Sequence, residues 1–333
     1  MAGTTRQSKQ RARTRATPAP VSDDHAIPIG ETNDALEVEL PQASLPYPWF
    51  SFVAKNDEAS VVKELERTIQ RLLESSQQAL GHYYVVALCD TEGSISGFSA
   101  DRLYAALRDG EKKKAVLLVL LSRGGSVEPA YQISKLCRAY SAEKFVVAVP
   151  REAKSAATLI AIGADEIHMG PLSHLGPIDP QLGRLPALGV VQALETITSL
   201  AEKFPGSWEM LSRYLQRVLT VEQIGYCQRI SESAMQYAER LLRTKPFLQE
   251  KAIEIAKDLV YEYKDHGFVI DLEEARSHLG EEWILSGTPE AEFAEEVYSI
   301  FEEVNVALRF FRRKYLSCVG GVGSGFMIFD LPS

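Results

Sequence analysis

The chain has 333 residues, of which 45% are hydrophobic and 24% are charged. This composition is ordinary for a globular protein, and the length allows a large core without disulfides or metal ions. The net charge of −9 argues against general binding to nucleic acid, which needs a basic surface. No window supplies the roughly 20 apolar residues that a membrane span requires, and the basic N-terminus lacks the apolar segment of a secretory signal. We therefore expect a cytoplasmic protein without a membrane span.

The cysteines show no paired spacing. Cys89, Cys137, Cys227 and Cys318 form no CxxC motif, so their spacing does not indicate a zinc site. Free cysteines are among the residue types most often buried as small apolar side chains. We therefore expect a reducing compartment, no metal and no cofactor.

The N-terminal segment is predicted to be a disordered tail. Residues 1–45 start basic and turn acidic, and they carry too little apolar surface to offset the chain entropy of folding. After them, the helical spacing of Val61, Leu65 and Ile69 predicts an amphipathic helix over residues 57–80.

Strands and helices then alternate along the chain. Apolar, β-branched runs predict strands over residues 82–89, 115–121, 145–149 and 166–169. Between them, helices are predicted over residues 99–110, 127–140 and 156–163. This alternation is typical of βαβ units with right-handed crossovers, and it predicts an α/β fold around a parallel sheet.

The pattern after Pro186 is mainly helical. Predicted helices cover residues 190–203, 208–219, 221–242, 247–263 and 289–313. We expect one domain over residues 46–285, a C-terminal helix over 286–313 and a flexible, glycine-containing tail over 314–333. Within that tail, residues 326–331 could dock as an edge strand.

The first segment with candidate chemistry is a glycine pair. Gly124 and Gly125 lie between the most apolar strand and a predicted helix. Glycine lets the backbone approach a reacting group closely, and the amides of a helix N-terminus favour an anion. No GxxxxGK[ST] or GxGxxG motif accompanies the pair. The pair is therefore a candidate oxyanion hole, although a simple tight turn would have the same sequence.

The second segment begins at Ser155, which opens a helix of small residues after the next predicted strand. An ordinary N-cap serine would have the same sequence. Hydrolases also place a nucleophile at such a strand–turn–helix junction. Gly125 and Ser155 are 30 residues apart (155 − 125), about one helix and one strand. In a parallel sheet both would therefore lie at the carboxyl ends of neighbouring strands, where ligands bind.

Several segments resemble the serine dehydrogenase proteinase (SDH) family, a group of Clp-fold serine peptidases near signal peptide peptidase A. They are Gly124-Gly125, Lys154–Ala161, Gly163–Ile167, Leu175–Gln181 and a later stretch that starts at His266. The resemblance covers about residues 80–285. It implies a Clp/crotonase-type spiral of βαβ units and hydrolysis of peptide bonds through a serine acyl-enzyme. It also implies Ser155 as nucleophile and an oxyanion hole at Gly124 and Gly125.

The sequence leaves the general base open. Lys203 lies 48 residues after Ser155 (203 − 155), a separation similar to that of the Ser–Lys members of this peptidase group. His174 lies in a loop where a Clp-type histidine could fall, and His266 lies in the later matching segment. Asp179 could orient a histidine or make an Asx-Pro turn, and the turn is favoured.

Three functions fit these residues. The first is a serine peptidase, ATP-independent by itself, that acts on peptide or protein substrates. The second is a catalytically silent Clp-fold subunit that binds partners. The third is a crotonase-like enzyme whose glycine pair binds an acyl-CoA. By analogy with the fold, the apolar stripes of the helices over residues 190–313 also predict a homo-oligomer.

Overall fold

The computed structural model describes residues 48–110, 114–182, 185–263 and 265–332. The predicted tail over residues 1–45 lies outside these ranges. All described residues belong to one compact unit. None of their helices is both long and apolar enough to cross a bilayer.

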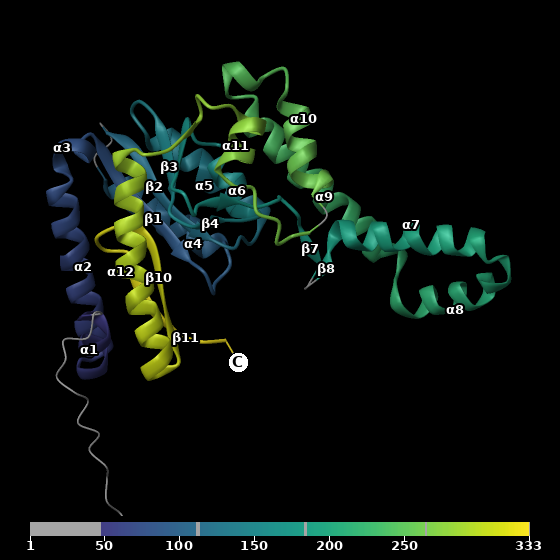
Figure 1. Ribbon diagram of the computed structural model, residues 1–333, viewed down its shortest axis with the longest axis horizontal. Helices are drawn as coiled ribbons and strands as arrows, with labels where there is room; N and C mark the ends of the chain where they lie inside the picture. Colours follow the sequence, from purple (N-terminus) through teal and green to yellow (C-terminus); the bar gives the residue numbers. More distant parts are fainter. Residues whose placement is uncertain (1–47, 111–113, 183–184, 264, 333) are drawn as a thin grey trace, which may run out of the picture. The chain divides into compact units, whose positions relative to one another are not determined.

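The described strands form a main sheet of nine strands (Figure 1). Its parallel part consists, in spatial order, of β1 (Tyr83–Asp90), β2 (Ala115–Ser122), β3 (Phe145–Val149), β5 (Glu166–Met169) and β9 (Ile284–Leu285). Successive residues of β2 point into two separate apolar cores: Leu118 belongs to one core and Leu117 to the other. All residues of β2 are therefore buried, as its continuous apolar sequence predicts.

Short strands extend the sheet beyond the carboxyl end of β2. β4 (Glu152–Ala153) pairs with β2 at Ser122, and β6 (His174–Leu175) pairs with β4. A separate hairpin is formed by β7 (Gln181–Leu182) and β8 (Leu185–Pro186). The chain thus returns repeatedly to the edge at which the predicted site residues lie.

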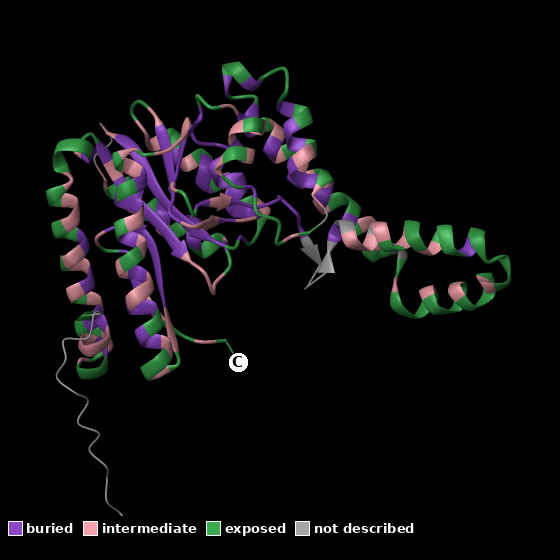
Figure 2. Cartoon of the chain, viewed as in Figure 1, coloured by how far each residue is buried: buried purple, intermediate pink, exposed green. Residues whose placement is uncertain are grey.

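Helices cover both faces of the main sheet (Figures 1 and 2). One face packs against α1 (Pro48–Lys55), α2 (Glu58–Ser75) and α12 (Pro289–Arg312). The other face packs against α4 (Gly97–Asp109), α5 (Val127–Tyr140), α6 (Ala156–Ala161), α10 (Ala252–Lys257) and α11 (Leu272–Leu279). This layering of helix, sheet and helix confirms the predicted α/β fold built from βαβ units.

The remaining helices follow the predicted helical region. They are α7 (Ala187–Lys203), α8 (Trp208–Val218) and α9 (Val221–Leu242), while α3 (Gln77–Leu80) leads into β1. Single-turn segments lie at Pro205–Ser207, Pro246–Leu248 and Asp258–Glu262. The second half of α9 joins the core through Ala234, Ala238 and Leu241. α7 and α8, by contrast, lie beyond the sheet, where α7 contacts α9 and α8 contacts α7 (Figure 1).

The C-terminus differs from the predicted flexible tail. β10 (Lys314–Gly321) pairs antiparallel with β1, and β11 (Phe326–Asp330) pairs antiparallel with β10. The alternative that residues 326–331 dock as an edge strand is therefore confirmed, with the strand ending at Asp330. The physical reason is that β1 is apolar on both faces and would otherwise expose an unpaired edge. Pairing with that edge outweighs the low strand propensity of the glycines.

A buried polar cluster joins β5 to the N-terminus of α12. His168 is almost fully buried, and its two ring nitrogens lie 2.7 Å from Thr288 Oγ1 and 3.3 Å from Glu166 Oε2. Lys144 Nζ donates to Glu166 Oε2 over 2.7 Å. The hydrogen bond with His168 and the nearby Lys144 lower the pKa of Glu166 to about 2, although partial burial opposes the shift.

This cluster predicts an acid-sensitive contribution to stability. A carboxyl group whose pKa falls on folding stabilises the folded state above its unfolded pKa and loses that contribution as the pH falls towards the folded pKa. Glu166→Gln should therefore lower the free energy of unfolding at pH 7 by about 1–3 kcal/mol. The difference from wild type should shrink as the pH falls from about 4.5 towards about 2. Urea unfolding across this pH range measures it, with the exposed Glu282→Gln as a control that should change little.

Candidate active site

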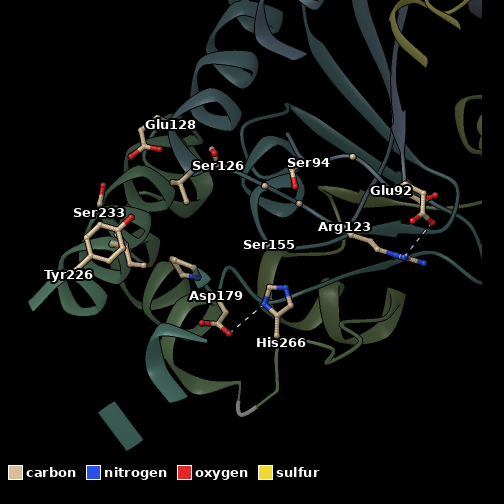
Figure 3. A pocket seen from close by; sticks show the side chains of 17 residues that line it. Glu92, Ser94, Arg123, Ser126, Glu128, Ser155, Asp179, Tyr226, Ser233 and His266 are labelled. Carbon is tan, nitrogen blue, oxygen red and sulfur yellow. Dashed lines mark ion pairs between the residues drawn. The ribbon is translucent and has the colours of Figure 1, made fainter. Parts of the chain in front are cut away.

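A cavity of about 820 Å³ opens at the carboxyl ends of β1 and β2 (Figure 3). Its walls come from the loop after β1, the loop after β2 with the start of α5, the turn at Ser155, the segments that carry Asp179 and His266, and the first part of α9. The lining includes the predicted nucleophile, both predicted oxyanion glycines and one of the predicted bases, namely Ser155, Gly124, Gly125 and His266. Other lining residues are Thr91, Glu92, Gly93, Ser94, Arg123, Ser126, Val127, Glu128, Asp179, Pro180, Tyr226, Ile230 and Ser233. Residues far apart in the sequence therefore meet at one place.

Ser155 lies between β4 and α6 in a backbone conformation that residues other than glycine rarely adopt. Its φ is 52° and its ψ is −117°, and its side chain makes no capping hydrogen bond to α6. The interpretation of Ser155 as an ordinary N-cap is therefore wrong. A strained serine at a strand-to-helix turn is typical of hydrolytic nucleophiles, because the turn presents the hydroxyl to the cavity.

The glycine pair lies directly against this turn. A Cβ atom at Gly124 would lie 2.8 Å from the Lys154 carbonyl oxygen and 2.8 Å from Ser155 Cβ. Gly124 and Gly125 also have φ values of 111° and 153°. A residue with a side chain would be strained at either position. Glycines are thus required for the turn after β2 to approach the turn at Ser155 this closely.

The orientation of one peptide group points to an oxyanion donor. The Gly124 carbonyl accepts a hydrogen bond from the Ile95 amide over 2.9 Å. Because a trans peptide is planar, the amide of Gly125 points to the opposite side, away from Ile95. The amide of Gly124 is already engaged, since it donates to Ser122 Oγ over 3.2 Å. Of the two predicted glycine donors, Gly125 is therefore the one whose amide donates to no other residue in the described part of the chain.

A second donor was not predicted from the sequence. The amide of Ala156, the residue after the predicted nucleophile, has the position that completes the oxyanion hole in α/β-hydrolases. Neither this amide nor that of Gly125 donates a hydrogen bond to another described residue. The Ala156 amide could have been predicted from the sequence, because this donor is defined by its position directly after the nucleophile candidate Ser155.

His266 faces a carboxylate in the same cavity (Figure 3). Its Nδ1 lies 3.5 Å from Asp179 Oδ2. Asp179 is nearly buried, and its Oδ1 and the His266 Nδ1 make no hydrogen bond in the described part of the chain. Asp179 therefore lies where it can orient the imidazole, which differs from its favoured interpretation as an Asx-Pro turn. With Nδ1 turned to Asp179, Nε2 is the ring nitrogen left for proton transfer.

Main-chain pairing holds the segments that carry these two residues. Leu175 and Ile270 exchange hydrogen bonds of 2.9 and 3.0 Å, which fixes the loop after His266 to β6. The Ile178 amide donates to the Leu259 carbonyl over 2.8 Å and fixes the loop that carries Asp179. The pair is thus anchored by backbone contacts on both sides.

Thr158 connects the turn at Ser155 to the loop that carries Asp179. It lies one turn into α6 and is fully buried. Its hydroxyl lies 2.7 Å from the carbonyl oxygens of both Ala153 and Gly176, and it accepts from the Gly176 amide over 3.2 Å. One buried side chain therefore links the strand before Ser155 to the loop that precedes Asp179.

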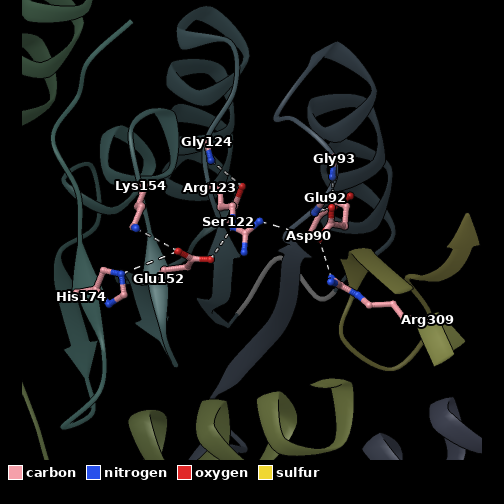
Figure 4. Close-up of polar contacts among 10 residues, drawn as sticks. All are labelled: Asp90, Glu92, Gly93, Ser122, Arg123, Gly124, Glu152, Lys154, His174 and Arg309. Carbon is pink, nitrogen blue, oxygen red and sulfur yellow. Dashed lines mark hydrogen bonds and ion pairs between the residues drawn. The ribbon is translucent and has the colours of Figure 1, made fainter. Parts of the chain in front are cut away.

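The other two predicted bases lie elsewhere. Lys203 is exposed at the end of α7 and does not line the cavity. His174 lies in β6, where its Nε2 is 4.0 Å from Glu152 Oε2 (Figure 4). Burial, followed by the nearby charge of Lys154, lowers the pKa of His174. His174 belongs to a charged network beside the site and is not part of the cavity lining.

Residues 95–206 match the profile of a family described as ClpP-like SDH-type serine proteinases. The resemblance to the SDH family is thereby confirmed. The matched stretch contains the glycine pair, Ser155 and Asp179, whereas His266 lies outside it. The observed α/β sheet accords with the Clp-type fold that this family implies.

Two curated relatives are uncharacterised proteins of Methanocaldococcus jannaschii. The first is 32% identical over 203 residues, which is 61% of this chain and 63% of the relative. The second is 31% identical over 94 residues, which is 28% of this chain and 32% of the relative. The chain therefore spans less than two thirds of the length of these relatives.

Two solved structures are similar to this chain at low sequence identity. One is a variant of the 1510-N membrane-bound stomatin-specific protease, with a TM-score of 0.40, 15% identity and coverage of 75% of this chain and 93% of that chain. The other is ClpP1 from Listeria monocytogenes, with a TM-score of 0.38, 15% identity and coverage of 67% and 98%.

The close approach of the glycine pair predicts a specific intolerance to substitution. Gly124→Ala should lower the free energy of unfolding by about 1–3 kcal/mol, because the new methyl group meets Ser155 and the φ value is unfavourable. Gly97→Ala is a matched control, since a Cβ atom there meets no atom within 4 Å. Thermal and urea unfolding of both variants measure the effect. Equal stability of the two variants would contradict the proposed packing.

Proposed function

We propose that this protein is a serine peptidase in which Ser155 is the nucleophile and His266 is the general base. One observation carries the proposal: the strained Ser155 turn, the free amide of Gly125 and the His266–Asp179 pair share one cavity. A serine hydroxyl needs a base to remove its proton and donors to stabilise the oxyanion. The described residues offer both. The match to a serine proteinase family supports the same reaction.

The residues support a two-step hydrolysis. His266 Nε2 takes the proton from Ser155 Oγ, which attacks the carbonyl carbon of the scissile peptide bond. The resulting oxyanion accepts hydrogen bonds from the amides of Gly125 and Ala156. His266 then passes the proton to the leaving nitrogen, the C–N bond breaks and an acyl-enzyme remains. Water, deprotonated by the same imidazole, releases the acyl group and restores the serine.

Asp179 has a supporting role in this scheme. Its carboxylate faces the Nδ1 of His266. It would hold the tautomer with the Nε2 lone pair free and would stabilise the imidazolium that forms during each step. Lys203 and His174 are the weaker alternatives as bases, because neither lines the cavity that contains Ser155.

Labelling with a fluorophosphonate probe tests this assignment. Ser155→Ala should abolish labelling, and His266→Ala should slow it by at least about 100-fold, since general-base catalysis contributes about 10²–10⁴-fold. Asp179→Asn should also slow it. Lys203→Met and His174→Gln serve as controls that should label at the wild-type rate. Loss of labelling in Lys203→Met with retention in His266→Ala would instead identify a Ser–Lys enzyme, and a folded wild type that is never labelled would favour a silent Clp-fold subunit.

We also propose that the protein forms a homo-oligomer through α7 and α8. The two helices and the turn between them expose apolar side chains: Phe204 is 63% exposed, Trp208 54%, Met210 65% and Tyr214 59%. Such a concentration of exposed apolar side chains is typical of an interaction surface. The surface also carries acidic and basic residues, such as the paired Glu209 and Arg213. This balance of charge suits contact with a second copy of the same surface.

The oligomer proposal predicts a change of molecular mass. The double variant Trp208→Ser and Tyr214→Ser should dissociate the assembly, because it removes the two exposed aromatic rings of α8. Light scattering coupled to size-exclusion chromatography measures this. Phe310→Ser is a matched control, since Phe310 is 75% exposed on a different helix. A wild-type mass equal to that of one chain would contradict the proposal.

We further infer that the protein acts in a reducing compartment such as the cytoplasm. Its four cysteines are free and buried. Burial raises the pKa of the Cys89 and Cys137 thiols to about 12 in each case. Cysteines of this kind act as packing residues and do not require an oxidising environment.

A further inference from the structure

The turn at Gly124 and Gly125, called the oxyanion turn below, is supported by a part of the chain that the family profile does not cover. The profile match spans residues 95–206. β1 and its following loop lie before this stretch, whereas α12 and β10 lie after it. The loop over residues 91–94 nevertheless lines the cavity. The contacts that fix this loop therefore affect the geometry of the cavity.

Asp90, the last residue of β1, organises the loop (Figure 4). Its Oδ1 accepts hydrogen bonds from the amides of Gly93 over 2.5 Å and Glu92 over 3.1 Å. Its Oδ2 accepts the hydroxyl of Ser317, a buried residue of β10, over 2.8 Å. The Asp90 carboxylate therefore shapes the loop through Oδ1. Through Oδ2 it is itself held by β10, the first strand of the C-terminal hairpin formed by β10 and β11.

The loop transmits this geometry to the glycine pair. Ile95, the residue that follows the loop, donates from its amide to the Gly124 carbonyl over 2.9 Å, and its own carbonyl accepts the amide of Ser126 over 2.8 Å. A Cβ atom at Gly125 would lie only 2.3 Å from the Ile95 nitrogen. The two backbones are thus in contact. A displacement of Ile95 would rotate the peptide group whose N–H is the oxyanion donor.

A second contact from the C-terminal region acts on the same loop. Arg309 of α12 donates to Glu92 Oε1 over 2.7 Å. The Glu92 carboxylate also lies 4.0 Å from Arg123, which directly precedes the glycine pair (Figure 4). α12 and β10 therefore hold the loop through two different side chains.

We propose that Asp90 is a positioning residue for the Gly125 amide, and that Ser317 of the C-terminal hairpin holds Asp90 in place for this role. The inference rests on the proposed function, because it assigns the Gly125 amide to the oxyanion hole. Asp90 does not touch the reacting atoms. It acts through the loop over residues 91–94 and the Ile95 backbone. The C-terminal hairpin is in this way a component of the catalytic unit.

Kinetics of fluorophosphonate labelling test the proposal on the full chain. The oxyanion donors act in the transition state of labelling, so Asp90→Ala should lower the maximal rate, kinact, by about 10- to 100-fold, with the probe affinity KI changed by less than about 2-fold. Ser317→Ala should lower kinact by a smaller factor. Asp90→Asn, which keeps one acceptor oxygen for the loop amides, should recover part of the rate. A kinact of Asp90→Ala equal to that of wild type would overturn the proposal.

Lys314→Met is the matched control for hairpin stability. Lys314 lies on β10 like Ser317, but its ion pairs are with Glu58 and Asp330 and not with residues 91–94 of the loop. We expect this variant to lower the melting temperature without lowering kinact. An equal loss of kinact in Lys314→Met would mean that hairpin stability alone matters, and would also overturn the proposal.

Hydrogen exchange separates this inference from the proposed function. In Asp90→Ala, the amides of residues 91–96 and 123–126 should exchange faster than in wild type, whereas in Lys314→Met they should not. If the wild type is never labelled but exchange rises as expected, the peptidase assignment fails and the positioning role stands. If exchange in residues 123–126 does not change, the positioning role fails regardless of labelling.

Discussion

The contact between the Gly124 backbone and Ser155 is the constraint on which the rest of the site depends. A single added carbon at Gly124 would lie 2.8 Å from Ser155 Cβ, so only glycine lets the two chain reversals meet. Both reversals have positive φ values, which are costly to maintain. The rigid sheet around them offsets this cost, because pairing of Ser122 with Ala153 brings the ends of β2 and β4 side by side.

The other candidate site residues are positioned outward from this contact. The carbonyl of Gly124 is held by Ile95, which leaves the neighbouring amide directed away from that contact. Thr158 links the turn at Ser155 to the loop that leads to Asp179. Asp179 then faces His266, whose segment is fixed to β6 by main-chain hydrogen bonds. Each candidate catalytic side chain is thus placed mainly by contacts between distant segments.

The C-terminal region has more than a covering role. β10 completes the edge of β1, and α12 packs on the face of the sheet opposite to α4 and α5. Both elements also reach the cavity loop through Ser317 and Arg309. A region that sequence patterns mark as peripheral is therefore continuous with the core and with the site. This continuity joins the stability of the sheet to the geometry of the turn at Gly124 and Gly125.

The sequence by itself determined the strands and helices of the βαβ units, since continuous apolar runs and helical spacing act locally. It also marked Ser155 and the glycine pair, because their chemistry depends on immediate neighbours in a strand–turn–helix junction. Only the tertiary structure brought His266 into the cavity and left Lys203 outside it. It likewise decided that residues 314–321 form a strand. These outcomes depend on pairing between distant segments, and the free energy of such pairing belongs to both partners and cannot be read from either one alone.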